Sequence, residues 1–187
     1  MTVAPHAAYF PDFLTPCAEV PDVETGAELV LATPSRRLRA EIGRLAPVDG
    51  PGATLLGELA RGKPAALWHL RRALQLYCRS LIEPDLEVLD EGLRVECAGG
   101  VHRYLHAGPE GLLRWLGPAT RWQPPVLVVD YPVDRDLFLD GRGLALIPSY
   151  FGVYHPVAPA DPRLRPVLVF PIHAGAGCRP AGTAATT

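Results

Sequence analysis

Two histidines, His102 and His106, have the spacing in this sequence that most readily suggests metal chemistry. A separation of four residues places two side chains on one face of a helix. A zinc site needs at least a third ligand, however, and the H-E-x-x-H pattern is absent. The four cysteines, at positions 17, 78, 97 and 178, include no C-x-x-C pair. The sequence therefore predicts no metal site and two solvated histidines.

Carboxylates that could serve acid–base catalysis gather in one short segment, at Asp130, Asp134, Asp136 and Asp140. Arginines close to them in the sequence favour turn caps and surface ion pairs instead. Ser149 precedes His155 by six residues, but the G-x-S-x-G turn that presents a nucleophilic serine is missing. We therefore predict no catalytic residue, no cofactor and no enzymatic activity.

Aromatic residues are the remaining candidates for a site, because small-molecule pockets combine aromatic walls with a few polar groups. The candidate ligand-binding residues on this basis are Trp68, Tyr77, Arg121, Trp122 and His155. The alternative is that these aromatic residues pack in the core.

Composition limits the class of protein. The 187 residues fit one domain, and 48% hydrophobic with 20% charged residues is typical of a globular chain. The net charge of −2 does not predict nucleic-acid binding by charge alone. There is no run of 18 apolar residues and no secretory signal, so the sequence predicts a cytoplasmic protein without a membrane span.

Helices are predicted for most of the first two-thirds of the chain. Asp22 is expected to cap a helix to about residue 31, and Thr33 a second helix that begins with Pro34. Further helices are expected around 55–62, over 64–82, from 84 to about 106, and over 109–116. In the helix from 84, the expected packing stripe is Leu86, Leu89, Leu93, Cys97 and Tyr104. His102 and His106 lie opposite this stripe, together with Val88 and Val95.

Strands are predicted near the end of the chain. The run Val126–Val129 is typical of a buried strand, and 167–170 of another. Segments 137–139 and 144–147 flank an Asp140-Gly141 turn and predict a hairpin. The expected fold is α+β: a helical first two-thirds and then a small antiparallel sheet. We expect one domain over residues 1–173 and a disordered tail over 174–187. The aromatic and proline residues of segment 9–16 predict an extended arm over about 1–20, which lays Phe10, Phe13 and Leu14 onto another element.

An ordered set of motifs resembles a known family. The motifs are Tyr9-Phe10-Pro11-Asp12-Phe13-Leu14-Thr15-Pro16, Ala32-Thr33-Pro34, Gly111-Leu112-Leu113, Trp122-x-Pro124-Pro125-Val126-Leu127, Asp140-Gly141-Arg142-Gly143-Leu144 with Pro148-Ser149-x-Phe151, and Pro166-Val167-Leu168-Val169-Phe170-Pro171. Their order over about residues 7–173 resembles the region that precedes the winged helix in actinobacterial ArsR-like transcriptional regulators.

The resemblance implies the effector-sensing or dimerisation domain of a cytoplasmic regulator. It implies a homodimer, or pairing with a full-length paralogue, and a small-molecule effector. No helix–turn–helix pattern follows Ile172, so we expect a truncated regulator that would reach DNA only through a winged helix absent from this chain. The alternatives are a stand-alone small-molecule-binding protein or enzyme derived from such a domain, and a non-functional remnant.

Overall fold

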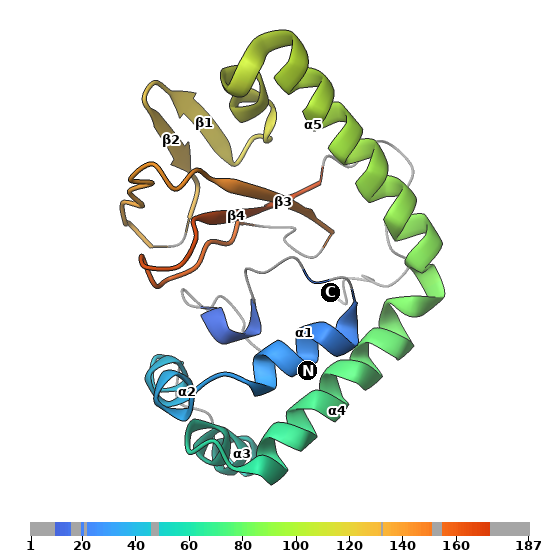
Figure 1. Ribbon diagram of the computed structural model, residues 1–187, viewed down its shortest axis with the longest axis vertical. Helices are drawn as coiled ribbons and strands as arrows, with labels where there is room; N and C mark the ends of the chain where they lie inside the picture. The colour runs from blue at the N-terminus through green and yellow to red at the C-terminus, as the bar shows by residue number, and fades with distance from the viewer. Residues whose placement is uncertain are drawn as a thin grey trace, which may run out of the picture.

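The computed structural model describes residues 10–15, 20, 22–45, 49–131, 133–150 and 155–172, and it confirms an α+β architecture (Figure 1). The helices are η1 (Asp12–Leu14), α1 (Val23–Leu31), α2 (Ser35–Ile42), α3 (Pro51–Ala60), α4 (Pro64–Leu81), η2 (Glu83–Asp85) and α5 (Leu86–Trp115). The strands are β1 (Thr120–Gln123), β2 (Val126–Val129), β3 (Ala145–Ser149) and β4 (Val167–Pro171). Most of the predicted arm and all of the predicted disordered tail, 174–187, lie outside the described residues.

The helix starts follow the capping residues closely. Asp22 caps α1 as predicted, because its Oδ1 accepts a hydrogen bond of 2.8 Å from the backbone N–H of Thr25. The predicted cap of α2 is wrong by one residue. Pro34, not Thr33, is the residue before the first helical position, since its ψ of 138° is extended. The helix therefore starts at Ser35 and has no side-chain cap.

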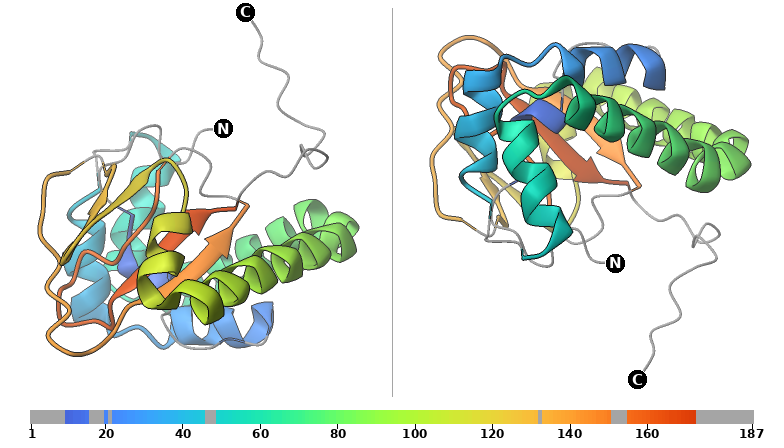
Figure 2. Two further views of the ribbon diagram at one scale, coloured as in Figure 1. Left: turned by 90° about the horizontal axis from the view of Figure 1, so that it is seen from above. Right: turned by 90° about the horizontal axis from the view of Figure 1, so that it is seen from below.

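Two long helices, α4 and α5, run end to end through η2 and form one edge of the molecule (Figures 1 and 2). The break predicted after residue 106 is present: Gly108 adopts φ 64° and ψ −167°, which separates the main length of α5 from its last turns. Among the described residues, no helix is both long enough and apolar enough to cross a membrane.

The packing face of α5 differs from the predicted stripe. Of the predicted stripe, Leu89 and Leu93 are half-buried but Leu86, Cys97 and Tyr104 are exposed, while the buried positions are Glu96 and Gly100. The physical reason is the Trp115 ring, which comes within 3.2 Å of where a Cβ on Gly100 would lie. A glycine lets the ring approach the helix backbone, so the buried face is rotated toward residues that carry no hydrophobic signal in the sequence.

The strands form two separate pairs. β1 and β2 are antiparallel, with Thr120 opposite Val129. β3 and β4 are parallel, with Ala145 opposite Val167, so the predicted hairpin and the wholly antiparallel sheet are wrong. The predicted turn does form, with positive φ at Asp140 and Gly141.

The guanidinium of Arg142 explains why the chain after this turn pairs elsewhere. It donates hydrogen bonds to the carbonyl oxygens of Pro162 at 2.7 Å and Leu164 at 2.9 Å. These bonds hold the turn against the segment that leads into β4. The backbone N–H of Ala145 then donates to the Pro166 carbonyl at 2.9 Å, which starts the parallel pairing.

Two apolar clusters lie on either side of the N-terminal arm. One joins the arm to the helices and contains Phe13, Val30, Leu38, Ile42, Leu59 and Ala66. The other lies between the end of α5 and the strands and contains Leu116, Leu168 and Phe170. The prediction that Phe13 and Leu14 of the arm pack onto another element is confirmed, whereas Phe10 remains 45% exposed.

Candidate functional site

The five predicted ligand-binding residues lie in different parts of the molecule. Trp68 and Tyr77 are about half exposed on α4, and nine residues of helix place them on opposite sides of it. Arg121 and Trp122 lie together on β1, near the other end of the molecule (Figure 1), and His155 is exposed in the segment before β4. Whether any of them contacts a ligand stays a prediction.

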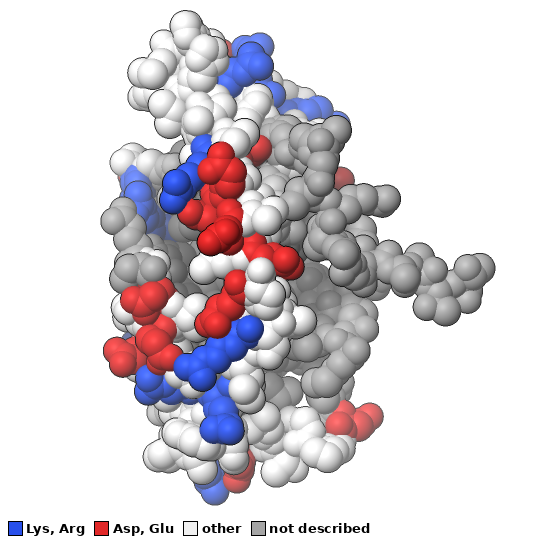
Figure 3. Space-filling model, turned by 90° about the vertical axis from the view of Figure 1, so that its right-hand side faces the viewer, with Lys and Arg blue, Asp and Glu red and all other residues white. Residues whose placement is uncertain are grey.

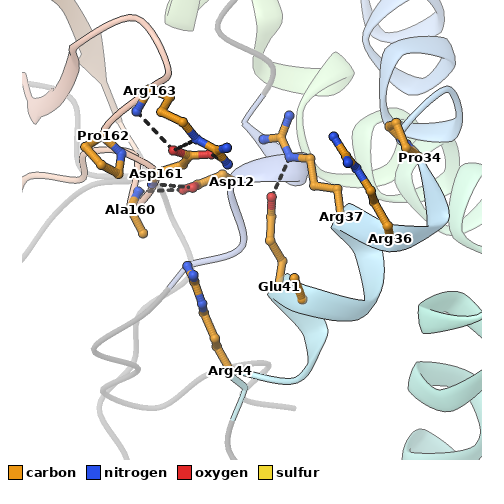
Figure 4. A pocket seen from close by; sticks show the side chains of 11 residues that line it. Asp12, Pro34, Arg36, Arg37, Glu41, Arg44, Ala160, Asp161, Pro162 and Arg163 are labelled. Carbon is orange, nitrogen blue, oxygen red and sulfur yellow. Dashed lines mark hydrogen bonds and ion pairs between the residues drawn. The ribbon is translucent and has the colours of Figure 1, made fainter.

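The described residues do form a pocket, at a different place. It has a volume of about 700 Å³ and lies between α2, the arm and the segment 160–163 (Figure 4). Its lining is Asp12, Pro34, Arg36, Arg37, Ala40, Glu41, Arg44, Ala160, Asp161, Pro162 and Arg163. None of the five predicted residues contributes to it. Four arginines and three carboxylates give this pocket a strongly ionic lining.

Asp12 is the residue that joins the two ends of the described chain. Its side chain is buried, with 2% of the residue exposed. Oδ1 accepts a hydrogen bond from the backbone N–H of Ala160 at 2.8 Å, and Oδ2 accepts one from Asp161 at 2.9 Å. Backbone N–H groups that hydrogen-bond to a carboxylate compensate for the loss of its hydration. Asp12 therefore acts as an anchor for segment 160–161.

Glu41 binds the arm from the opposite side of the pocket. It is also buried, and its Oε2 accepts a hydrogen bond from the backbone N–H of Phe13 at 2.7 Å. Its Oε1 accepts from Nε of Arg37 at 2.5 Å, one helical turn earlier. The carboxylate thus fixes both the arm and the Arg37 side chain. Because both its oxygens are occupied by protein donors, Glu41 has little capacity to bind another cation.

Asp161 and Arg163 form the third ionic group of the lining. The guanidinium of Arg163 donates to both carboxylate oxygens, at 3.0 Å from Nε and 2.8 Å from Nη2, and its backbone N–H donates to Oδ1. The side-chain hydrogen bonds from Arg163 lower the pKa of Asp161 to about 2, and the charge of Arg37 adds to this effect. Asp161 is therefore a carboxylate throughout the physiological pH range.

Arginines dominate the start of α2. Arg36 and Arg37 occupy its first turn, where no acidic residue is present. The N-terminus of a helix carries a partial positive charge, so cations there are unfavourable and anions favourable. Arg36 makes no ion pair with any residue that the structure describes. The first turn of α2 thus brings together two like-charged side chains and the positive end of a helix.

The residues of this pocket were not among the predicted site residues. Aromatic and proline residues predict the arm, but they do not indicate a function for Asp12. Arg37 and Glu41 have the i,i+4 spacing of a helical ion pair, a signal that was available locally. The contact between Asp12 and residues 160–161 spans 148 positions or more, and no local pattern predicts it.

Among the other side chains singled out in the sequence are the histidine pair of α5 and the turn at Asp140. His102 and His106 are exposed, as predicted, and their ring centroids lie 4.2 Å apart. Within the described residues, no three His, Cys, Asp or Glu side chains converge to hold a metal ion. Asp140 lies 3.7 Å from Arg142, which agrees with the ion pair expected in this turn.

Comparison of the chain with protein-family models, with curated proteins and with solved structures finds no match. The arrangement of residues within the molecule therefore carries the functional argument.

Proposed function

We propose that this chain is the effector-sensing and dimerisation domain of a transcriptional regulator of the ArsR-like winged-helix type, and that it pairs with a second copy through α5. The observation that carries the proposal is a heptad-spaced row of exposed residues on this helix that includes the apolar side chains of Val88, Val95 and Leu105. The motif resemblance of the sequence supplies the class of regulator.

The exposed row has the spacing of a coiled-coil seam. Val88, Val95 and His102 are seven residues apart, and Glu91, Ala98 and Leu105 follow each of them by three. We call these six residues the α5 seam. All six are exposed, with 55% of Val88, 63% of Val95 and 75% of Leu105 accessible. Such a heptad row is buried when a second helix lies along it.

Packing within the chain uses a different side of α5. This helix contacts η2, β1 and β3, and its buried residues are Glu96 and Gly100. At 100° per residue, the middle of the α5 seam lies more than a third of a turn from the direction midway between these two residues, although Val95 is the direct neighbour of Glu96. Exposed apolar side chains such as Val88, Val95 and Leu105 are typical of protein–protein interfaces, although Glu91 and His102 make this row partly polar. None of the six seam residues is buried by the described part of the chain.

Charge favours an antiparallel pair of α5 helices. The exposed carboxylates Glu87, Asp90 and Glu91 lie in its first half, where Asp90 already pairs with Arg94 at 2.7 Å. Arg103 lies in its second half with the two histidines, beside the ion pair between Glu110 and Arg114. Figure 3 shows this outer side of the molecule, with carboxylates gathered over its middle and arginines above and below them. Antiparallel pairing places the acidic half of one helix against the basic half of the other, which favours association of a second copy.

The experiment is a measurement of molar mass in solution by light scattering after gel filtration. We expect a dimer for the native chain and a monomer for the double variant Val95→Arg with Leu105→Arg. Tyr104→Arg is the matched control, because it places the same cation at an exposed apolar position of α5 outside the seam. Circular dichroism should show equal helix content for all three chains.

A native chain that remains monomeric at its highest soluble concentration would contradict the pairing. If both Tyr104→Arg and the double variant are monomeric, the dimer interface includes a surface of α5 other than the seam. Pairing with a full-length regulator that carries the same motifs is the second expected association, and co-purification of the two chains measures it.

A stand-alone small-molecule-binding protein is the second candidate, and the pocket beside Asp12 favours it. The regulator requires pairing through α5, whereas the stand-alone binding protein does not. A monomeric native chain that retains a small molecule in native mass spectrometry would favour the stand-alone protein over the regulator.

A further inference from the structure

The geometry points to the pocket between α2 and segment 160–163 as a binding site for a small organic anion that carries phosphate or carboxylate groups. This inference deepens the effector-sensing part of the proposed function, because it names the chemical class of effector. It rests on the lining of the pocket and not on the association of two chains.

The carboxylates of the lining are already occupied by protein donors. Asp12 accepts two backbone N–H groups, Glu41 accepts Phe13 N–H and Arg37, and Asp161 accepts Arg163. A cation entering the pocket would have to compete with these short hydrogen bonds. Each carboxylate of the lining therefore already has at least two donors from the protein.

The arginines of the lining still have N–H groups that could donate hydrogen bonds to a ligand. Arg36 makes no ion pair in the described part of the chain, and the recorded bond from Arg37 to Glu41 uses Nε. Each guanidinium carries five N–H donors in a planar fork, which matches two oxygens of a carboxylate or phosphate. Figure 4 shows arginines reaching the pocket from α2 and from segment 160–163. An anion between them would have donors on more than one side.

The start of α2 adds a second source of attraction for an anion. The first N–H groups of a helix have no partner within the helix, and Pro34 offers them no side-chain cap. The N–H groups of Arg37 and Leu38 already donate to the Pro34 carbonyl oxygen, so an anion in the pocket would accept from the N–H of Arg36 and offset the repulsion between the Arg36 guanidinium and the helix dipole. The arrangement is unfavourable while empty and becomes favourable with an anion present.

The size of the pocket indicates an organic molecule and not an isolated inorganic ion. Ligand pockets for small organic molecules have volumes of about 300–1,000 Å³, and this pocket has about 700 Å³. Pro34, Ala40 and Pro162 supply apolar lining between the charges. The ligand class is therefore a compact organic anion whose charged group meets the arginines and whose body meets the prolines.

The test is a titration of the full chain by calorimetry, with thermal unfolding as a second readout. The probes are inorganic phosphate, glucose 6-phosphate and succinate, and glucose is the neutral control. We expect the anions to bind and to raise the unfolding temperature, glucose to do neither, and affinity to fall as sodium chloride is added. Stronger binding of glucose 6-phosphate than of succinate would assign a phosphate ligand, and the reverse order a carboxylate ligand.

Arg36→Ala and Arg39→Ala form a matched pair of variants. Both residues are exposed arginines of α2, but Arg36 lines the pocket and Arg39 does not. Loss of charge-assisted hydrogen bonds should weaken binding about tenfold or more in Arg36→Ala, while Arg39→Ala should bind as the native chain does. Neither side chain is buried, so both variants should fold.

Two results would overturn the inference. One is the absence of binding by all three anions, since an anion site built from these arginines must retain at least inorganic phosphate or succinate at millimolar concentration. The other is equal weakening in Arg36→Ala and Arg39→Ala, which would indicate general attraction to a basic helix. The titration is repeated on the Val95→Arg, Leu105→Arg chain, where anion binding should persist even if dimerisation fails.

Discussion

Helices α2 and α5 use their apolar side chains in opposite ways. α2 has eight residues and buries three of them, Leu38, Glu41 and Ile42, against the arm and α3. α5 has thirty residues, and the buried ones are Glu96 and Gly100. The apolar residues of α2 hold this chain together, whereas those of the α5 seam remain exposed. The spacing of apolar residues therefore predicts that a helix forms, but it does not predict whether its apolar face packs within the same chain.

The largest effect is expected from truncating the apolar face of α2. Leu38 is fully buried, and Leu38→Ala should lower the free energy of unfolding by about 2–5 kcal/mol, because it removes packed methyl groups and leaves a cavity. The matched variant Leu105→Ala should lower the stability of the monomer by less than about 0.5 kcal/mol. We would measure urea unfolding of both variants in a Val95→Arg background, after light scattering has shown that this background is monomeric. Similar losses would mean that α5 packs within its own chain.

The second-largest loss of stability is expected from removing the hydrogen bonds that Asp12 accepts beside α2. Asp12→Ala leaves the N–H groups of Ala160 and Asp161 without their acceptor, which should cost about 1–3 kcal/mol. Asp12→Asn keeps one acceptor oxygen and should lose less. Urea unfolding measures both, and hydrogen exchange at residues 160 and 161 should quicken in Asp12→Ala. Unchanged exchange there would show that the arm does not anchor this segment.

The smallest change in the free energy of unfolding is expected when the pH is lowered. The folded pKa of Asp161, about 2, lies below its ordinary value of 3.8. Its ion pair with Arg163 therefore adds stability above about pH 4, and this stability is lost as the pH falls toward about 2. The gain is small because Arg163 is largely exposed. The stability difference between the native chain and Asp161→Asn should shrink over this range, and a constant difference would contradict the assignment.

Local features of the fold were predictable because they depend on neighbouring residues. Asp22 predicted the start of α1 through its capping oxygen, and the separate helix expected from Pro109 predicted the break in α5. The Asp140-Gly141 pair predicted a turn because both residues tolerate positive φ. Each of these signals acts within about four positions of the chain.

The remaining features depend on residues far apart in the sequence. The turn at Asp140 predicted a hairpin, but bonds from Arg142 to residues 162 and 164 direct β3 toward β4. The packing face of α5 was misplaced because glycines carry no hydrophobic signal. The pocket combines Asp12, α2 and segment 160–163, and no spacing within one element could have shown that these meet.

The contact between Asp12 and residues 160–161 also sets an order of events during synthesis. Asp12 leaves the ribosome early, but its hydrogen-bond donors are made 148 residues later. At about 5–20 residues per second, the carboxylate waits about 7–30 seconds for its partners. Phe13 can pack against α2 and its neighbours during that interval, because those helices are already complete. The arm would then be in place as a template when segment 160–161 emerges, and the ionic pocket would form late, shortly before β4 is made and pairs with β3.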